Sequence, residues 1–256
     1  PASKLGLKPG EFITVQNAIN ALAVKSANDV ATVIAESISG TEISFAKAMT
    51  KKAHSLGMKK TEFRNASGLY NKRQKTTAKD MSILAAALIT KHNRYYKFFA
   101  TPSFTHKSKK YINHNSLLRN YKGTDGIKTG YLSTEKYSLS ASILRNKRRL
   151  IAVGSGYETK NSRSKQTAKL LTYGITNFDL IEIYNSSKDT IELDVWLGKK
   201  AIIDLIVPED VLFTLDKKNY KKYEARVIYH NPIVAPIIKD NIYGKLIISD
   251  TIKGDI

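Results

Sequence analysis

Two short polar triplets are the residues of this sequence best suited to chemistry. Lys128-Thr129-Gly130 follows an Asp-Gly turn signal, and Ser26-Ala27-Asn28 lies far upstream. A lysine that a desolvated, cation-rich cleft holds neutral can activate a serine hydroxyl for acyl transfer. The triplets therefore indicate two of the three sites of a serine acyl-transferase that uses lysine as its base.

Each residue of the triplets suits one part of such a reaction. The Lys128 ammonium and the Thr129 hydroxyl can bind a substrate carboxylate. Gly130 leaves out a side chain that would block approach to the strand edge. Ser26 can pass a proton from the lysine base to the leaving amine, and Asn28 can orient the acyl group and that lysine.

The third site should be a Ser-x-x-Lys nucleophile, and none precedes Ser26. Three such sequences occur elsewhere, at 44–47, 133–136 and 162–165. The first lies in a predicted helix with its lysine facing water, and the other two follow both triplets. Such matches arise by chance in a chain rich in serine and lysine. Because the chain opens at Pro1 without a methionine or a signal sequence, we expect the nucleophile segment to be missing ahead of it.

Each triplet alone is a weak signal. Lysine is abundant here, Thr-Gly commonly ends a turn, and Ser and Asn commonly cap helices. The order of the triplets, their separation and the structural setting predicted for each make the pair more specific than either one.

The composition limits the class of protein. The 256 residues are 42% hydrophobic, enough for one large domain or two smaller ones. The absence of cysteine excludes disulfides and permits export. No apolar run approaches the roughly 20 residues that cross a bilayer. The histidines show no metal-ligand spacing, so we expect no metal and no other cofactor.

The net charge of +20 comes from 42 Lys and Arg against 22 Asp and Glu. Nucleic acid, an anionic membrane surface or an anionic cell-wall polymer could each balance it. However, the lysines are spread along the chain and form no basic stripe interleaved with aromatic residues. We expect no nucleic-acid partner, and a solvated basic surface is the simplest interpretation.

Helical patterns surround the first triplet. Thr14 can cap a helix that leads to Ser26-Ala27-Asn28, and Asp29 can cap the next. The triplet therefore lies at a helix junction, where short polar side chains can face a cleft. A further helix begins near Thr77, with Asp80 in its first turn and a continuous apolar face.

From Ile127 the apolar period changes from helical to alternating. Residues 137–143 alternate between apolar side chains and serine, and a turn at 145–148 leads to a second strand at 150–153. A closing helix through Phe178 can pack on this hairpin. The sequence thus predicts an α+β domain in which an antiparallel sheet is flanked by helices.

The pattern beyond residue 180 is one of short strands separated by turns, which favours a small all-β domain resembling a β-sandwich. We place the domain boundary between 1–180 and 181–256. The expected strands lie at 191–195, 201–207, 211–215, 224–229 and 245–248.

At this point the sequence resembles the low-molecular-mass penicillin-binding proteins, the serine-type D-alanyl-D-alanine carboxypeptidases that trim peptidoglycan stem peptides. The resemblance is strongest from Pro1 to Phe178. Besides the triplets, it rests on Leu7-Lys-Pro-Gly10, Leu56-Gly-Met58, Phe63-Arg-Asn-Ala-Ser-Gly-Leu69, Thr76-Thr-Ala-Lys-Asp-Met81, Asn113-His-Asn115 and Asp125-Gly-Ile-Lys-Thr-Gly130.

The resemblance implies a penicillin-recognising, β-lactamase-like domain followed by the β-rich domain. It implies a hydrolase that removes the terminal D-alanine of stem peptides ending in D-Ala-D-Ala through an acyl-serine intermediate. β-Lactam antibiotics would acylate this enzyme, which would lie in the bacterial periplasm or on the outer face of the cytoplasmic membrane. The amphipathic anchor usual in the family is not found before Ile256, so peripheral membrane association would need a missing terminal segment.

The resemblance also implies roles for particular residues. His114 and Arg163 match polar or basic positions near the cleft that help hold a carboxylate, although for His114 a purely structural role between two asparagines is an equal alternative. Glu135-Lys136 replace a small Ala-Gly pair that the family often has before the next strand, which leaves loop shape and substrate preference open. The implied catalytic residues are Ser26, Asn28 and Lys128, and the substrate-binding residues are Lys128, Thr129, Gly130, Arg163 and His114.

Two other functions remain as alternatives. A β-lactamase would share the motifs but would need a carboxylate base for deacylation, and no glutamate stands out for that task. A non-catalytic module that binds peptidoglycan or another polyanion agrees with the charge and the missing serine. The 256-residue chain itself is expected to be inactive for lack of the nucleophile segment.

Overall fold

The computed structural model describes residues 3–219, 222–251, 254 and 255. The chain divides into two units, Pro1–Tyr173 and Gly174–Ile256. The boundary after residue 180 stays a prediction. Within the described residues, every helix is too short or too polar to cross a membrane.

Helices dominate the first hundred residues of the chain, and one long helix follows the central sheet. The short η1 is a π-helix and η2 a 3-10 helix. The helices are α1 (Val15–Asn20), η1 (Ala21–Lys25), α2 (Asn28–Ser39), α3 (Glu42–Ser55), α4 (Ala78–Lys91), α5 (Asn93–Tyr96), η2 (Lys97–Ala100), α6 (Leu117–Asn120) and α7 (Lys160–Asn177).

Threonine side chains begin three of these helices. The Oγ1 atoms of Thr14, Thr41 and Thr77 accept hydrogen bonds of 3.2, 3.1 and 3.1 Å from the backbone amides three residues ahead. The helix starts expected at Thr14 and Thr77 are therefore confirmed. The cap expected at Asp29 is wrong, because Ala27 is the N-cap residue and α2 begins at Asn28. The Asp29 carboxylate accepts amides of a distant segment instead.

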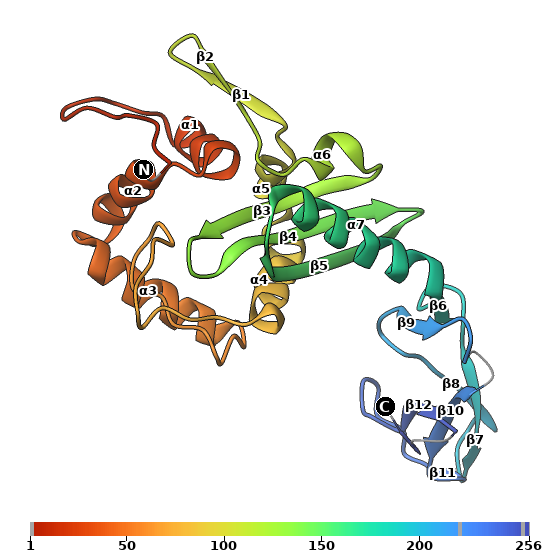
Figure 1. Cartoon of the computed structure of the whole chain (residues 1–256). Helices are drawn as coiled ribbons and strands as arrows, with labels where there is room; N and C mark the ends of the chain where they lie inside the picture. Colours follow the sequence, from red (N-terminus) through yellow and green to blue (C-terminus); the bar gives the residue numbers. More distant parts are fainter. Residues whose placement is uncertain (1–2, 220–221, 252–253, 256) are drawn as a thin grey trace. The chain divides into compact units, whose positions relative to one another are not determined.

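An antiparallel sheet in the order β3-β4-β5 lies beside these helices (Figure 1). Its strands are β3 (Thr124–Leu132), β4 (Lys136–Arg145) and β5 (Arg148–Tyr157). The predicted hairpin is confirmed, and it turns at Asn146 and Lys147, whose positive φ angles of 49° and 63° are typical of a tight hairpin turn. Helix α4 contacts β5, and α7 crosses the sheet in Figure 1. The predicted α+β arrangement is confirmed.

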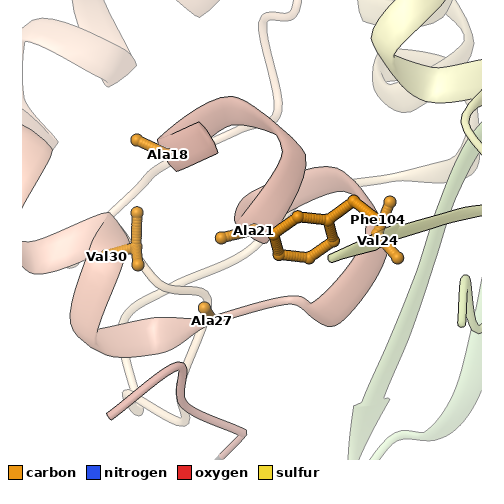
Figure 2. Close-up of a cluster of buried hydrophobic side chains, with 6 residues drawn as sticks. All are labelled: Ala18, Ala21, Val24, Ala27, Val30 and Phe104. Atoms are coloured by element: carbon orange, nitrogen blue, oxygen red, sulfur yellow. The ribbon is translucent and has the colours of Figure 1, made fainter. Parts of the chain in front are cut away.

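A second hairpin, β1 (Ser103–His106) with β2 (Lys109–Ile112), is not predicted by the sequence. Its Phe104 is buried in an apolar cluster with five small side chains of α1, η1, the helix junction and α2 (Figure 2). Tyr111 stacks on Phe104 with ring centres 5.3 Å apart and packs against the same cluster. The cluster therefore fixes this hairpin beside the junction that carries Ser26.

The second unit is built from short strands in separate two- and three-stranded sheets, with the orders β6-β9, β11-β7-β8 and β10-β12-β13. Tyr184, Leu193, Leu215 and Ile233 are buried within it. The predicted small all-β domain is confirmed. Its strands are β6 (Phe178–Tyr184), β7 (Ile191–Trp196), β8 (Ile202–Leu205), β9 (Val211–Asp216), β10 (Tyr223–Tyr229), β11 (Ile233–Val234), β12 (Gly244–Asp250) and β13 (Gly254–Asp255).

The end of the closing helix differs from the prediction. The closing helix was expected to run through Phe178, but α7 ends at Asn177 and Phe178 begins β6, where it pairs with Asp216. An aromatic side chain at helical spacing fits a strand equally well, and the pairing with β9 decides between them.

Candidate active site

Ser26 lies in a sharp turn between two helices. The π-helix η1 ends at Lys25, and Ala27 precedes the first residue of α2. Ser26 itself has φ 59° and ψ 48°, the left-handed conformation that residues other than glycine rarely adopt. The predicted helix junction is thus observed, and the turn directs the serine hydroxyl toward β3.

The first described segment of the chain holds this turn on both sides. Ser3 donates its Oγ hydrogen to the carbonyl of Lys25 at 2.8 Å, and its own carbonyl accepts the Asn28 amide at 2.8 Å. The Asp29 carboxylate accepts the three consecutive amides of residues 5–7 at 2.9, 2.7 and 3.2 Å. Burial acts to raise the pKa of Asp29, but these hydrogen bonds outweigh it and hold the pKa below its ordinary value.

Lys128 brings the two triplets together. It lies on β3 opposite Ser140 of β4, and its ammonium donates to Ser26 Oγ at 2.9 Å and to the carbonyl of Thr129 at 2.9 Å. Two residues that are 102 positions apart in the sequence therefore meet at hydrogen-bond distance. This is the convergence on which the sequence-based hypothesis depends.

The surroundings of Lys128 destabilise its charged form. Burial removes water from the ammonium and, together with the nearby charge of Arg163, lowers the pKa of Lys128 to about 8. No ion pair with a carboxylate opposes this effect among the described residues. The Lys128 ammonium therefore has no carboxylate partner among the described residues. A carboxylate ligand bound beside it would stabilise its charge.

Arg163 supplies the second positive charge. It lies on α7 and is buried, and its Nη2 donates to the carbonyl of His114 at 2.9 Å. Its guanidinium carbon lies 5.8 Å from the centre of the Tyr137 ring. Its Nε is buried and has no hydrogen-bond partner among the described residues. Burial lowers the pKa of Arg163.

His114 lies within the same cationic environment. Partial burial of its ring, followed by the charges of Lys128, Lys25, Lys160 and Arg163, lowers the pKa of His114. A neutral imidazole is therefore favoured near pH 7. Its carbonyl, which anchors Arg163, is the contact that the structure shows directly.

Gly130 and Asn28 complete the set of expected residues. Gly130 pairs with Ser138 of β4, and a Cβ atom at residue 130 would press on the Ser138 hydroxyl. Asn28 is half-buried as the first residue of α2. Among the described residues its side chain makes no hydrogen bond with Ser26 or Lys128, so its expected orienting role stays a prediction.

Residues 1–159 match the D-alanyl-D-alanine carboxypeptidase family of sequences, and residues 178–254 match the C-terminal domain of penicillin-binding protein 5. The chain belongs to the D-alanyl-D-alanine carboxypeptidase family. The resemblance to low-molecular-mass penicillin-binding proteins is thereby confirmed for both parts of the sequence.

Curated relatives of this family member agree with the assignment. The carboxypeptidase DacF of Bacillus subtilis is 33% identical over 252 residues, which are 96% of this chain and 64% of DacF. DacA of Escherichia coli K12 is 30% identical over 247 residues, 96% of this chain and 61% of DacA. The chain therefore spans a little under two thirds of the length of these relatives.

Solved structures of the family are similar to all or part of this chain. Penicillin-binding protein 5 from Haemophilus influenzae has a TM-score of 0.88 and 31% identity, covering 100% of this chain and 75% of that one. Penicillin-binding protein D2 from Listeria monocytogenes, in its ampicillin-bound form, has a TM-score of 0.62 and 29% identity, covering 68% of this chain and 73% of that one.

Sequence reasoning missed one residue of this carboxypeptidase-family site. Tyr137 lies under the Arg163 guanidinium, and its ring centre is 4.5 Å from that of Tyr131. The sequence pattern identifies Tyr137 only as an apolar position of a strand. Alternating apolar residues show which face of a strand is buried, but not which side chains cover that face. Among the described residues, no group of three or more His, Cys, Asp or Glu side chains is arranged to hold a metal.

Proposed function

We propose that this chain is the major part of a serine-type D-alanyl-D-alanine carboxypeptidase that hydrolyses the terminal D-alanine of peptidoglycan stem peptides through an acyl-serine intermediate. The observation that carries this proposal is the 2.9 Å contact between Lys128 Nζ and Ser26 Oγ. It puts a proton-relaying hydroxyl beside a cation that can bind a carboxylate. Membership of the family supports the same reaction.

The carboxylate of the terminal D-alanine is proposed to bind between Lys128, Thr129 and Arg163. Both cations are held in surroundings that lower their pKa, so an anionic ligand is favoured there. The Arg163 guanidinium supplies positive charge, and His114 positions Arg163 through its backbone carbonyl. Gly130 is proposed to leave the strand edge open to the substrate backbone.

Ser26 is proposed to carry the proton to the leaving amine, with Asn28 orienting the acyl group. The nucleophile is proposed to come from a Ser-x-x-Lys other than the three in this chain. Lys47, Lys136 and Lys165 of those three sequences are all exposed, and the hydroxyl of Ser162 caps the start of α7 through Thr159. The 256-residue chain is therefore proposed to form no acyl-enzyme.

β-Lactam binding and an exported location belong to the same proposal. The ampicillin-bound relative shows that a protein of similar fold holds a β-lactam. Peptidoglycan lies outside the cytoplasmic membrane, so the enzyme is proposed to act in the periplasm or at the outer face of that membrane.

A fluorescent penicillin tests the proposal directly. The 256-residue chain, the translated product of the complete gene, and that product with Lys128→Met are each incubated with the label and with a D-Ala-D-Ala peptide. We expect labelling and D-alanine release from the complete product only. Labelling of the 256-residue chain would show that its nucleophile lies within it, and an unlabelled, inactive complete product would overturn the proposed reaction.

A further inference from the structure

Two lysines meet at the ring of Tyr111, next to the proposed active site. The ammonium of Lys25, the residue before Ser26, lies 5.7 Å from the ring centre, and that of Lys109 lies 5.6 Å from it. A cation is attracted to the face of a tyrosine ring at such distances. Two positive charges therefore lie near one ring.

The ring is held in place by the core of the first unit. Tyr111 stacks on Phe104, and Phe104 is buried against Ala21 and Val24 of η1 (Figure 2). The hairpin β1–β2 and η1 are in contact, so Lys25 and Lys109 arrive from two separate elements at one fixed aromatic surface. Groups that are positioned before binding lose less freedom when a ligand arrives.

Neither ammonium is neutralised within the described residues. Glu11 is the acidic side chain beside this hairpin, and it pairs with Lys107 at 2.6 Å rather than with Lys25 or Lys109. Its other oxygen accepts the amide of Lys8 at 3.2 Å. The pair of lysines therefore has no carboxylate partner among the described residues.

The charge of Lys25 also reaches the proposed active site. It acts on the His114 ring together with Lys128 and Arg163, the cations proposed to bind the terminal carboxylate. A peptide whose last carboxylate lies between Lys128 and Arg163 and whose reacting bond lies at Ser26 would extend past Lys25. The residue just before the terminal D-Ala-D-Ala is then the part of the peptide that comes nearest to both lysines.

We infer that Lys25, Lys109 and Tyr111 form an anion subsite that recognises a second carboxylate, on the side chain of the residue preceding D-Ala-D-Ala. The subsite selects peptides with a free side-chain carboxylate over peptides in which that group is an amide. This inference rests on the proposed function, because it takes the groove at Ser26 and Lys128 as the peptide site.

The test is an equilibrium titration of the 256-residue chain, followed by NMR, with two synthetic peptides. They are acetyl-Gly-Glu-D-Ala-D-Ala and acetyl-Gly-Gln-D-Ala-D-Ala, which differ only in one carboxylate. We expect the Glu peptide to bind about three- to ten-fold more tightly at low salt, the range for two exposed ion pairs. The ratio should fall toward one in the double variant Lys25→Met with Lys109→Met and should persist in the corresponding double arginine variant.

A matched control removes the same charge elsewhere. The double variant Lys47→Met with Lys165→Met loses two exposed lysines of α3 and α7 and should keep the ratio of the parent chain. Equal affinity of the parent chain for both peptides, or an unchanged ratio in the Lys25 and Lys109 methionine variant, would overturn the subsite alone. If the chain bound neither peptide, the subsite would be overturned, whereas the proposed function would still be decided by labelling of the complete gene product.

Discussion

The buried charge of Lys128 lowers the stability of the folded chain. Its ammonium is charged below pH 8 yet held away from water, and its hydrogen bonds go to a hydroxyl and a carbonyl rather than to a carboxylate. Because the pKa is lower in the folded state than in the unfolded chain, the unfolded state binds more protons between pH 8 and the ordinary lysine range. The contribution of Lys128 to folding free energy therefore becomes more favourable as pH rises through that interval.

Lys128→Met should consequently stabilise the chain at pH 7. We expect the free energy of unfolding to rise by about 1–3 kcal/mol at pH 7, from the size of the pKa shift. The difference from the parent chain should shrink by pH 10, where the parent lysine is mostly neutral in the folded state. Urea denaturation of both proteins at the two pH values measures it. A difference that is the same at both values would contradict the assigned cause.

The residue types predicted which side chains form the candidate site, but not their backbone conformations or all of their contacts. The order of the Ser-x-Asn and Lys-Thr-Gly triplets indicated that Ser26 and Lys128 meet, and the structure brings them together. The left-handed conformation of Ser26 had no signal, because a π-helix that ends in such a turn depends on packing around it rather than on the serine itself. The stacking of Tyr137 under Arg163 also joins elements whose contact no local pattern encodes.

At the scale of elements, local chemistry was predictable and distant pairing was not. Thr14 and Thr77 begin helices through bonds to amides three residues away, so the sequence contains the whole interaction. The hairpin β1–β2 turns at Lys107 and Ser108, whose φ angles of 47° and 61° are positive although neither residue is the Gly or Asn that usually marks such a turn. Its stability comes from Phe104 in a distant helical cluster, which a strand pattern cannot reveal.

Asp29 joins α2 to the segment at residues 5–7, a contact that no local sequence pattern reveals. It offers a test at the scale of elements. Asp29→Asn leaves one acceptor oxygen in the side chain where the carboxylate has two. It also directs the side-chain NH2 group toward the backbone amides of residues 5–7, which are themselves donors. We expect a loss of about 1–3 kcal/mol in the free energy of unfolding at pH 7. Hydrogen exchange of those three amides should accelerate more than that of the β4 amides.

The pH dependence of this loss has a defined sign. The folded pKa of Asp29 lies below its unfolded value, so its stabilisation is complete above the ordinary aspartate range and disappears as pH falls through the folded pKa. The parent chain and Asp29→Asn should therefore converge in stability at low pH. Asp204→Asn, at an exposed position of β8, is the matched control and should leave stability at pH 7 within about 0.5 kcal/mol. An equal loss in both variants would contradict the specific role of Asp29.

At the scale of the whole molecule, composition set limits but did not supply the function. The net charge of +20 permitted several anionic partners, and only the position of particular lysines distinguishes a solvated surface from a binding site. Lys47 and Lys165 are exposed on helices, whereas Lys25 and Lys109 meet at one aromatic ring. The matches to both parts of the chain, rather than its charge, identified the family.

The two units should behave as separate folding units because each has its own buried core. Leu139 is 1% exposed in the first unit and Leu193 is 2% exposed in the second. Replacing either by alanine removes buried contacts and leaves a cavity, which costs about 2–5 kcal/mol. In differential scanning calorimetry we expect two transitions, with Leu139→Ala lowering the midpoint of one and Leu193→Ala lowering that of the other. Leu212→Ala, at a side chain that is 53% exposed, should shift neither by more than a degree or two. A single transition that both core variants lower equally would show instead that the units fold as one cooperative body.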